Sequence, residues 1–139
     1  MWDVDLGFGS PYEREGVDLS DPNSLWVSGA HLSDELSEKE SIFSLLCRHK
    51  DFRLEAEKQW KEYFIPHIDE LLNDIDMAYE ANKESIVLDK YKWNSEGTYS
   101  QIEEQVDDNI KTLRQFIIQR SDFLTDTYLN EKWKSSNYL

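Results

Sequence analysis

The sequence predicts a mainly α-helical fold, in which a short N-terminal strand and a loop precede a bundle of four to five helices. Over most of the chain, apolar residues recur at spacings of three and four, which is the repeat of one helix face. Within residues 1–9, the stretch WDVDL instead alternates between apolar and acidic side chains, which is the repeat of a strand. We therefore expect a single domain over residues 1–139, with a strand at 1–9, a loop at 10–36 and helices over 37–139.

Start and stop signals divide the helical region. Ser37 with Glu40 three residues later forms a capping-box pattern, which predicts that a short helix begins there. Pro66 has no amide hydrogen to donate, so it predicts a break in the long apolar run that follows. Residues 82–97 are expected to form a shorter helix or a loop.

The last expected helix, over residues 99–124, has the clearest repeat of apolar residues at spacings of three and four, which places an apolar stripe along one face. Arg120 is unusual because its charge lies on the apolar stripe. One interpretation is that its long side chain reaches solvent or pairs locally; the other is a buried pairing with an acid elsewhere in the fold. The stripe consists of Tyr99, Ile102, Val106, Ile110, Leu113, Ile117, Arg120 and Leu124.

Composition argues against several classes of partner. The chain has 29 acidic and 15 basic side chains, a net charge of −14, and no local basic patch. Such a chain is repelled by nucleic-acid phosphates and by anionic lipid, so neither nucleic acid nor membrane is an expected partner. No run approaches the roughly 20 apolar residues of a membrane span. The lone Cys47 lies in an apolar run and is expected in the core.

Asp3 and Asp5 form the most distinctive polar pair. Residues at i and i+2 of a strand share a face, so the two carboxylates concentrate negative charge unless a cation lies near them. Hard cations such as Mg²⁺ bind carboxylate oxygen together with substrate phosphates. The pair therefore indicates a Mg²⁺ site for a nucleotide, and the alternative is an exposed edge strand whose acids are solvated.

Other common sites fit the sequence poorly. A calcium loop starting at Asp3 would need Gly where Phe8 stands and Glu where Arg14 stands. No glycine-rich phosphate loop follows Gly9, and no Gly-Lys-Ser/Thr occurs. The three histidines are evenly spread without paired spacing, so they are expected to be surface or structural residues.

The N-terminal string MWDVDLGFG resembles the W-D-x-D-x-x-x-G signature of the CotH family of spore-coat-type atypical protein kinases. Two later passages resemble the same family in the same order. SIFSLLCRHKDFRLEAEKQWKEY is similar to its short helix with a leucine pair, followed by a helix with Trp. IKTLRQFIIQRSDFLTDTY is similar to its closing Arg-x-x-Phe-Leu pattern. The likeness covers nearly the whole chain.

The resemblance implies an ATP-dependent transferase that uses Mg²⁺ or Mn²⁺ and phosphorylates Ser or Thr of coat or secreted proteins. By the resemblance, Asp3 is the first metal ligand and the cofactor-binding residue. In distantly related atypical kinases the metal-binding aspartate stands five residues before a phenylalanine, as Asp3 does before Phe8. Asp5 is the second candidate ligand, so these two aspartates are the expected catalytic residues. The parent protein would then be secreted, cell-surface or spore-coat associated.

The resemblance also implies a missing part. In the family, the lysine-bearing nucleotide lobe precedes the W-D-x-D motif, so we expect this chain to be a C-terminal fragment that is inactive alone and that lacks sheet partners for its first strand. The alternative is a non-catalytic acidic helical module, a scaffold or a pseudokinase, which recruits a partner. The kinase interpretation predicts Asp3 and Asp5 beside a cleft, whereas the scaffold interpretation predicts exposed acids and an apolar groove elsewhere.

Overall fold

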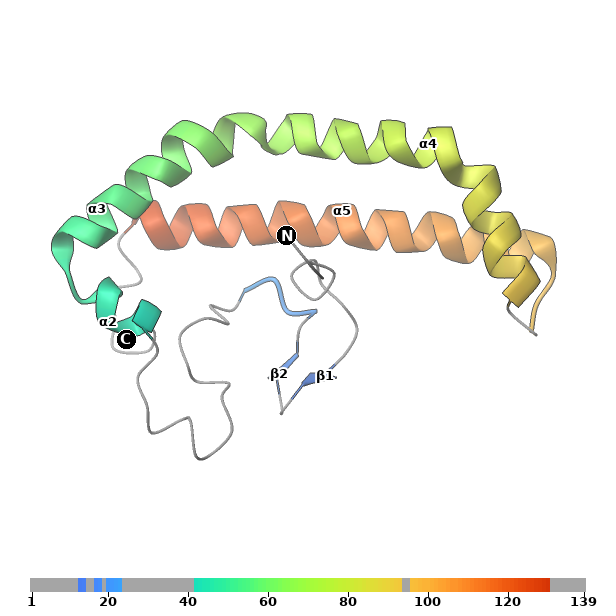
Figure 1. Ribbon diagram of the computed structural model, residues 1–139, viewed down its shortest axis with the longest axis horizontal. Coiled ribbons are helices and arrows are strands. Elements are labelled where there is room, and N and C mark those ends of the chain that lie inside the picture. The colour runs from blue at the N-terminus through green and yellow to red at the C-terminus, as the bar shows by residue number, and fades with distance from the viewer. Residues whose placement is uncertain (1–12, 15–16, 19, 24–41, 94–95, 131–139) are drawn as a thin grey trace. The chain divides into compact units, whose positions relative to one another are not determined.

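The computed structural model describes residues 13–14, 17–18, 20–23, 42–93 and 96–130 (Figure 1). The described chain is mainly helical, as predicted. Its elements are the strands β1 (Glu13–Arg14) and β2 (Val17–Asp18), then the helices α2 (Ile42–Cys47), α3 (Lys50–Gln59), α4 (Ile68–Trp93) and α5 (Tyr99–Leu129).

The expected strand at residues 1–9 and the capping box at Ser37 lie outside the described residues. Within the expected loop at 10–36, the described residues include a short antiparallel hairpin. β1 pairs with β2 in the register Glu13 opposite Asp18 and Arg14 opposite Val17. Strands of two residues are too short to show alternation, which explains why the periodicity gave no sign of them.

The predicted break at Pro66 is confirmed by the backbone. After α3, the chain forms a π-helical turn at Trp60–Phe64 and a 3₁₀ turn at Ile65–His67 before α4 begins. Pro66 cannot donate an amide hydrogen bond, and its ring crowds the preceding turn, so regular α-helix cannot pass through it. Trp60 opens the π turn, which places its indole in the irregular stretch.

The expectation for residues 82–97 needs correction, because α4 continues without interruption to Trp93 (Figure 1). Val87 explains the extension. Its side chain is 1% exposed and belongs to an apolar cluster with Tyr79, Ile102 and Val106. Burial of such a side chain contributes about 1.5–3 kcal/mol, which holds this part of the helix although its sequence is mixed.

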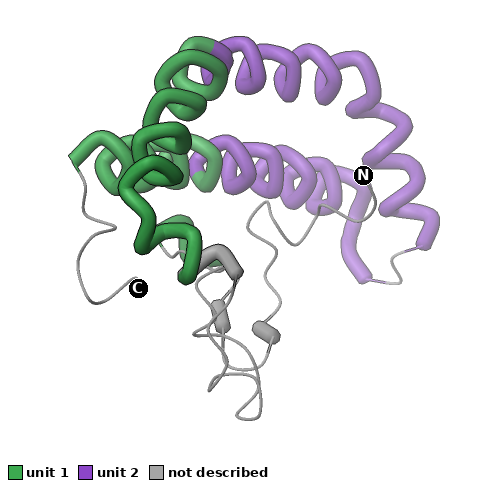
Figure 2. The backbone as a smooth tube through the Cα atoms, turned by 60° about the vertical axis from the view of Figure 1, so that its left-hand side comes forward, with its two compact units in different colours: residues 1–66, 116–139 green, residues 67–115 purple. Residues whose placement is uncertain are grey.

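The chain divides into two compact units, which Figure 2 distinguishes by colour. Unit 1 comprises residues 1–66 and 116–139, and unit 2 comprises residues 67–115. In unit 2, α4 and the first part of α5 enclose the cluster around Val87, with Ile110 packed against it. In unit 1, Cys47 is 2% exposed, which confirms its expected core position.

The start of α5 is fixed by local hydrogen bonds. The Thr98 hydroxyl accepts from the backbone N–H of Gln101 at 3.3 Å, and the side-chain Oε1 of Gln101 accepts from the backbone N–H of Thr98 at 2.8 Å. This reciprocal pair is a capping box, which satisfies two of the free amides at the helix start. Gly97 just before it has φ +106°, a conformation that favours glycine.

The predicted stripe on α5 is largely confirmed, since Ile102, Val106 and Ile117 are all buried. The helix runs further than expected, to Leu129, and Thr127 near its end is 1% exposed. None of the helices in the described part of the chain is long and apolar enough to cross a membrane.

Candidate functional site

Asp3 and Asp5 lie outside the described residues, so their assignment as metal ligands stays a prediction. Among the residues that the structure does describe, no group of three or more His, Cys, Asp or Glu side chains could hold a metal ion. His67 lies on the surface as expected, with its Nδ1 2.7 Å from a carboxylate oxygen of Glu70.

Arg120, the charge on the predicted apolar stripe, lies in unit 1 and is partly buried. Its Nη1 donates a hydrogen bond of 3.0 Å to the backbone carbonyl of Pro22, which is 98 residues away in sequence. Its guanidinium also lies 5.6 Å from the ring centroid of Phe123, within cation–π range. The contact with Pro22 is long-range, as one of the two interpretations required, but its acceptor is a carbonyl.

The segment that Arg120 contacts has a defined local structure. The amide of Asn23 donates to Oδ1 of Asp21 at 2.8 Å, which makes an Asx turn around Pro22. Burial lowers the pKa of Arg120, while the fields of Tyr128 and the Asp21 carboxylate oppose that effect. The side chain stays charged, since the ordinary pKa of arginine is far above neutrality.

Trp60 connects α5 to the irregular turn after α3. Its indole Nε1 donates to the hydroxyl of Thr125 at 2.9 Å, and its ring meets that of Tyr128 edge to face with centroids 5.6 Å apart. Burial raises the pKa of the Tyr128 phenol. Thr125 and Tyr128 come one and four residues after the Arg-x-x-Phe-Leu pattern, so Trp60 contacts the part of α5 that follows this pattern.

A polar cluster links α4 and α5 in unit 2, and sequence reasoning missed it. Tyr79 donates its hydroxyl proton to Asp107, and Lys83 Nζ lies 2.9 Å from the same carboxylate. Glu103 lies 3.4 Å from Lys83 Nζ. Tyr79 and Lys83, like Glu103 and Asp107, are four residues apart on one helix, so this spacing on both helices was the available signal.

The pKa values of this cluster shift in the directions that pairing requires. Hydrogen bonds from Lys83 and Tyr79 hold the pKa of Asp107 below its ordinary value. The hydrogen bond to Asp107 raises the pKa of Lys83. Burial, followed by the hydrogen bond to Asp107, raises the pKa of the Tyr79 phenol. At neutral pH Tyr79 is therefore a neutral phenol, Lys83 an ammonium and Asp107 a carboxylate. This arrangement is that of a structural link between two helices.

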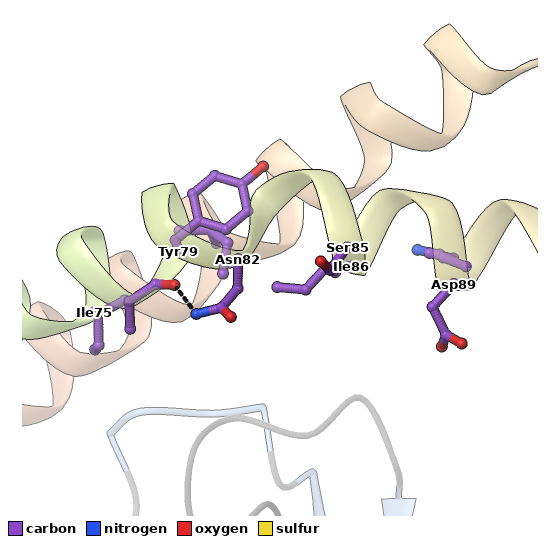
Figure 3. Close-up of a pocket in the computed structure, with 9 residues that line it drawn as sticks. Ile75, Tyr79, Asn82, Ser85, Ile86 and Asp89 are labelled. Carbon is purple, nitrogen blue, oxygen red and sulfur yellow. Dashed lines mark hydrogen bonds between the residues drawn. The ribbon is translucent and has the colours of Figure 1, made fainter.

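Unit 2 also contains a groove of about 690 Å³, formed mainly along α4 (Figure 3). Its walls are mostly apolar, with Asn82 near the middle and its side-chain amide bonded to the carbonyl of Ala78 at 2.8 Å. The volume lies in the range of ligand pockets, although the groove is open along its length. The lining residues are Ile75, Ala78, Tyr79, Asn82, Ser85, Ile86, Asp89, Lys90 and Ile110.

Comparison of the chain with known proteins finds no match to a family model, to a curated protein or to a solved structure.

Proposed function

We propose that this chain forms the metal-binding motif and the C-terminal helices of a CotH-like protein kinase that transfers the γ-phosphate of ATP to Ser or Thr of coat or secreted proteins. The observation that carries the proposal is the order of three motifs along the chain: W-D-x-D, the leucine pair with the Trp helix, and Arg-x-x-Phe-Leu. The nucleotide lobe would come from residues outside 1–139, and residues 1–139 alone would be inactive.

The donor set suits the proposed cofactor. In phosphoryl transfer, Mg²⁺ or Mn²⁺ neutralises charge on the β- and γ-phosphates, and the protein chiefly positions the reactants. Asp3 and Asp5 would supply carboxylate oxygens, which hard cations prefer. Among the described residues, support comes from the later motifs: Trp60 and Arg120 are both partly buried and make long-range contacts within unit 1.

The test is binding of ATP with Mn²⁺, measured by calorimetry on the longest natural chain that contains residues 1–139 and on residues 1–139 alone. We expect binding by the longer chain only, and its loss on Asp3→Ala. Asp108→Ala is the matched control, because Asp108 is an exposed aspartate in unit 2 that pairs locally with Lys111 at 2.8 Å. Failure of the longer chain to bind, or unchanged binding by Asp3→Ala, contradicts the proposal.

A second candidate is the non-catalytic binding module, and the groove on α4 is the observation that favours it. Unit 2 has more acidic than basic side chains, and Lys83, Lys111 and Arg114 already pair with acids of the same unit. The partner that fits is an amphipathic helix, with an apolar face for the groove and lysines or arginines beside it.

This candidate predicts that a synthetic amphipathic helix with leucine on one face and lysine on the other binds the chain, measured by fluorescence anisotropy. Ile86→Gln should weaken binding about tenfold or more, because Ile86 lines the groove. Leu88→Gln is the control, since Leu88 is 50% exposed on the same helix and does not line the groove. Equal effects of the two variants, or equal binding of a peptide with glutamate in place of lysine, would reject the groove as the site.

A further inference from the structure

We infer that Asp107 is a positioning residue for the groove on α4, because it holds the Tyr79 ring toward α5 and so keeps the groove open for a partner helix. The importance of the groove rests on the second candidate function, in which an amphipathic basic helix is the partner. The contacts themselves lie wholly among the described residues of unit 2. The polar cluster then does more than link the two helices.

Tyr79 belongs to both the groove and the polar cluster. It lines the groove, packs in the apolar cluster with Val87 and Ile102, and is 9% exposed. Its hydroxyl donates to Asp107 on α5. In Figure 3 the Tyr79 ring and the Asn82 side chain extend from α4 in different directions. The ring therefore forms a wall of the groove and does not fill it.

The acceptor of the Tyr79 hydroxyl is itself held in place. Lys83 Nζ lies 2.9 Å from Oδ1 of Asp107 and 3.1 Å from Oδ2, so both oxygens of the carboxylate face the ammonium. Hydrogen bonds to a charged acceptor are stronger than those between neutral groups. The position of Asp107 on α5 thus decides the direction in which the Tyr79 ring points.

Loss of the Asp107 carboxylate would leave the Tyr79 hydroxyl as a buried donor without this acceptor. Such a group is unfavourable until it finds another partner or water. The side chain can turn about its Cα–Cβ bond to a different staggered rotamer. The groove, which Tyr79 lines, offers open space for that turn. A ring that turns there reaches water, but it takes the volume that a partner helix would occupy.

The test measures affinity for the leucine–lysine helix, by fluorescence anisotropy, in variants designed around this hydrogen bond. Asp107→Ala removes the acceptor, and we expect about tenfold weaker binding, as when about one molecule in ten keeps the groove open. Asp107→Asn keeps a carbonyl oxygen at the same place, so most of the affinity should remain. Adding Tyr79→Phe to Asp107→Ala removes the orphan donor, so binding should recover.

A purely structural role of Asp107 would give a different pattern. If Asp107 acted only through its ion pair with Lys83, Asp107→Asn would weaken binding as Asp107→Ala does, and the added Tyr79→Phe would restore nothing. Asp108→Ala is the matched control, because Asp108 pairs with Lys111 at 2.8 Å and does not line the groove. Circular dichroism checks that every variant is folded. Asp107→Leu, which also lacks an acceptor but keeps side-chain volume and helix propensity, replaces Asp107→Ala if that variant is unfolded.

Fluorine NMR on the chain labelled with 3-fluorotyrosine observes the ring directly. The Tyr79 signal is assigned by its loss in Tyr79→Phe, and its shift between H₂O and D₂O reports exposure of the ring to water. We expect this solvent shift to increase in Asp107→Ala and to stay unchanged in Asp107→Asn and Asp108→Ala.

The two readouts separate this role of Asp107 from the second candidate function. An unchanged solvent shift in Asp107→Ala overturns the positioning of Tyr79, whatever the chain binds. A larger solvent shift with unchanged affinity for the helix overturns the effect on the groove. If the unaltered chain does not bind the helix, the second candidate function fails, and the solvent shift alone then decides whether Asp107 holds the ring.

Discussion

Replacing Ile102 with alanine is expected to lower the free energy of unfolding by about 2–5 kcal/mol, the usual range for truncating a fully buried aliphatic side chain. Ile102 is 0% exposed and packs with Tyr79, Val87 and Val106 in the core of unit 2. Among the described residues, the members of this cluster come from α4 and α5, and truncating Ile102 leaves a cavity between them. The loss therefore combines the missing transfer free energy with an unfilled void.

Urea unfolding followed by far-ultraviolet circular dichroism measures the effect. Ile86→Ala is the matched control, because it removes the same atoms from the same unit at a side chain that is 41% exposed. We expect its loss of stability to stay below about 1 kcal/mol. Equal losses at the two positions would mean that α4 and α5 do not enclose Ile102 as described.

Where the helices lie could be predicted from the sequence, because helix-face periodicity and proline chemistry are local properties. The stripe on α5 and the break at Pro66 follow from residues within one or two turns. The continuation of α4 through Val87 does not, since that residue is held by Ile102 and Val106 on another helix. Tertiary packing of this kind overrides a weak local pattern.

The candidate sites also depend on tertiary contacts that a local sequence pattern does not show. The sequence singled out Arg120 as a charge on an apolar face, but neither the carbonyl of Pro22 nor the Asx turn beside it has a periodic signal. The scaffold interpretation included an apolar groove without a position, and a groove of that kind is present on α4. Asp3 and Asp5 were chosen for their motif, and the described residues do not bear on that choice.

Replacing Asp107 with alanine is the second large effect that we expect. The change removes the acceptor of the Tyr79 hydroxyl and the nearer of the two carboxylates beside Lys83. Lys83 keeps Glu103 at 3.4 Å, but the buried Tyr79 keeps a hydroxyl donor without this acceptor. Leaving a partly buried donor without its acceptor is more harmful than losing an exposed ion pair. We expect a clear fall in the thermal unfolding midpoint, with a much smaller fall for Asp108→Ala, whose pair with Lys111 is exposed.

The interaction of Asp107 with Lys83 and Tyr79 also predicts that stability depends on pH. Because the pKa of Asp107 is held below its ordinary value of 3.8, its contribution is present above that value and is lost as pH falls through the lower, folded-state pKa. Lys83 and Tyr79 both have raised pKa values. For each, the unfolded chain releases its proton first, so their contributions are lost only above about pH 10.

Thermal melts from pH 2 to pH 7 test this acid limb. The unaltered chain should lose stability steeply below about pH 4, and Asp107→Ala should show a shallower decline over the same range, because it no longer has this carboxylate to protonate. Asp108→Ala should follow the unaltered chain. Parallel acid limbs for all three proteins would mean that other carboxylates set the acid stability and that the link between Asp107, Lys83 and Tyr79 contributes little to holding α4 against α5.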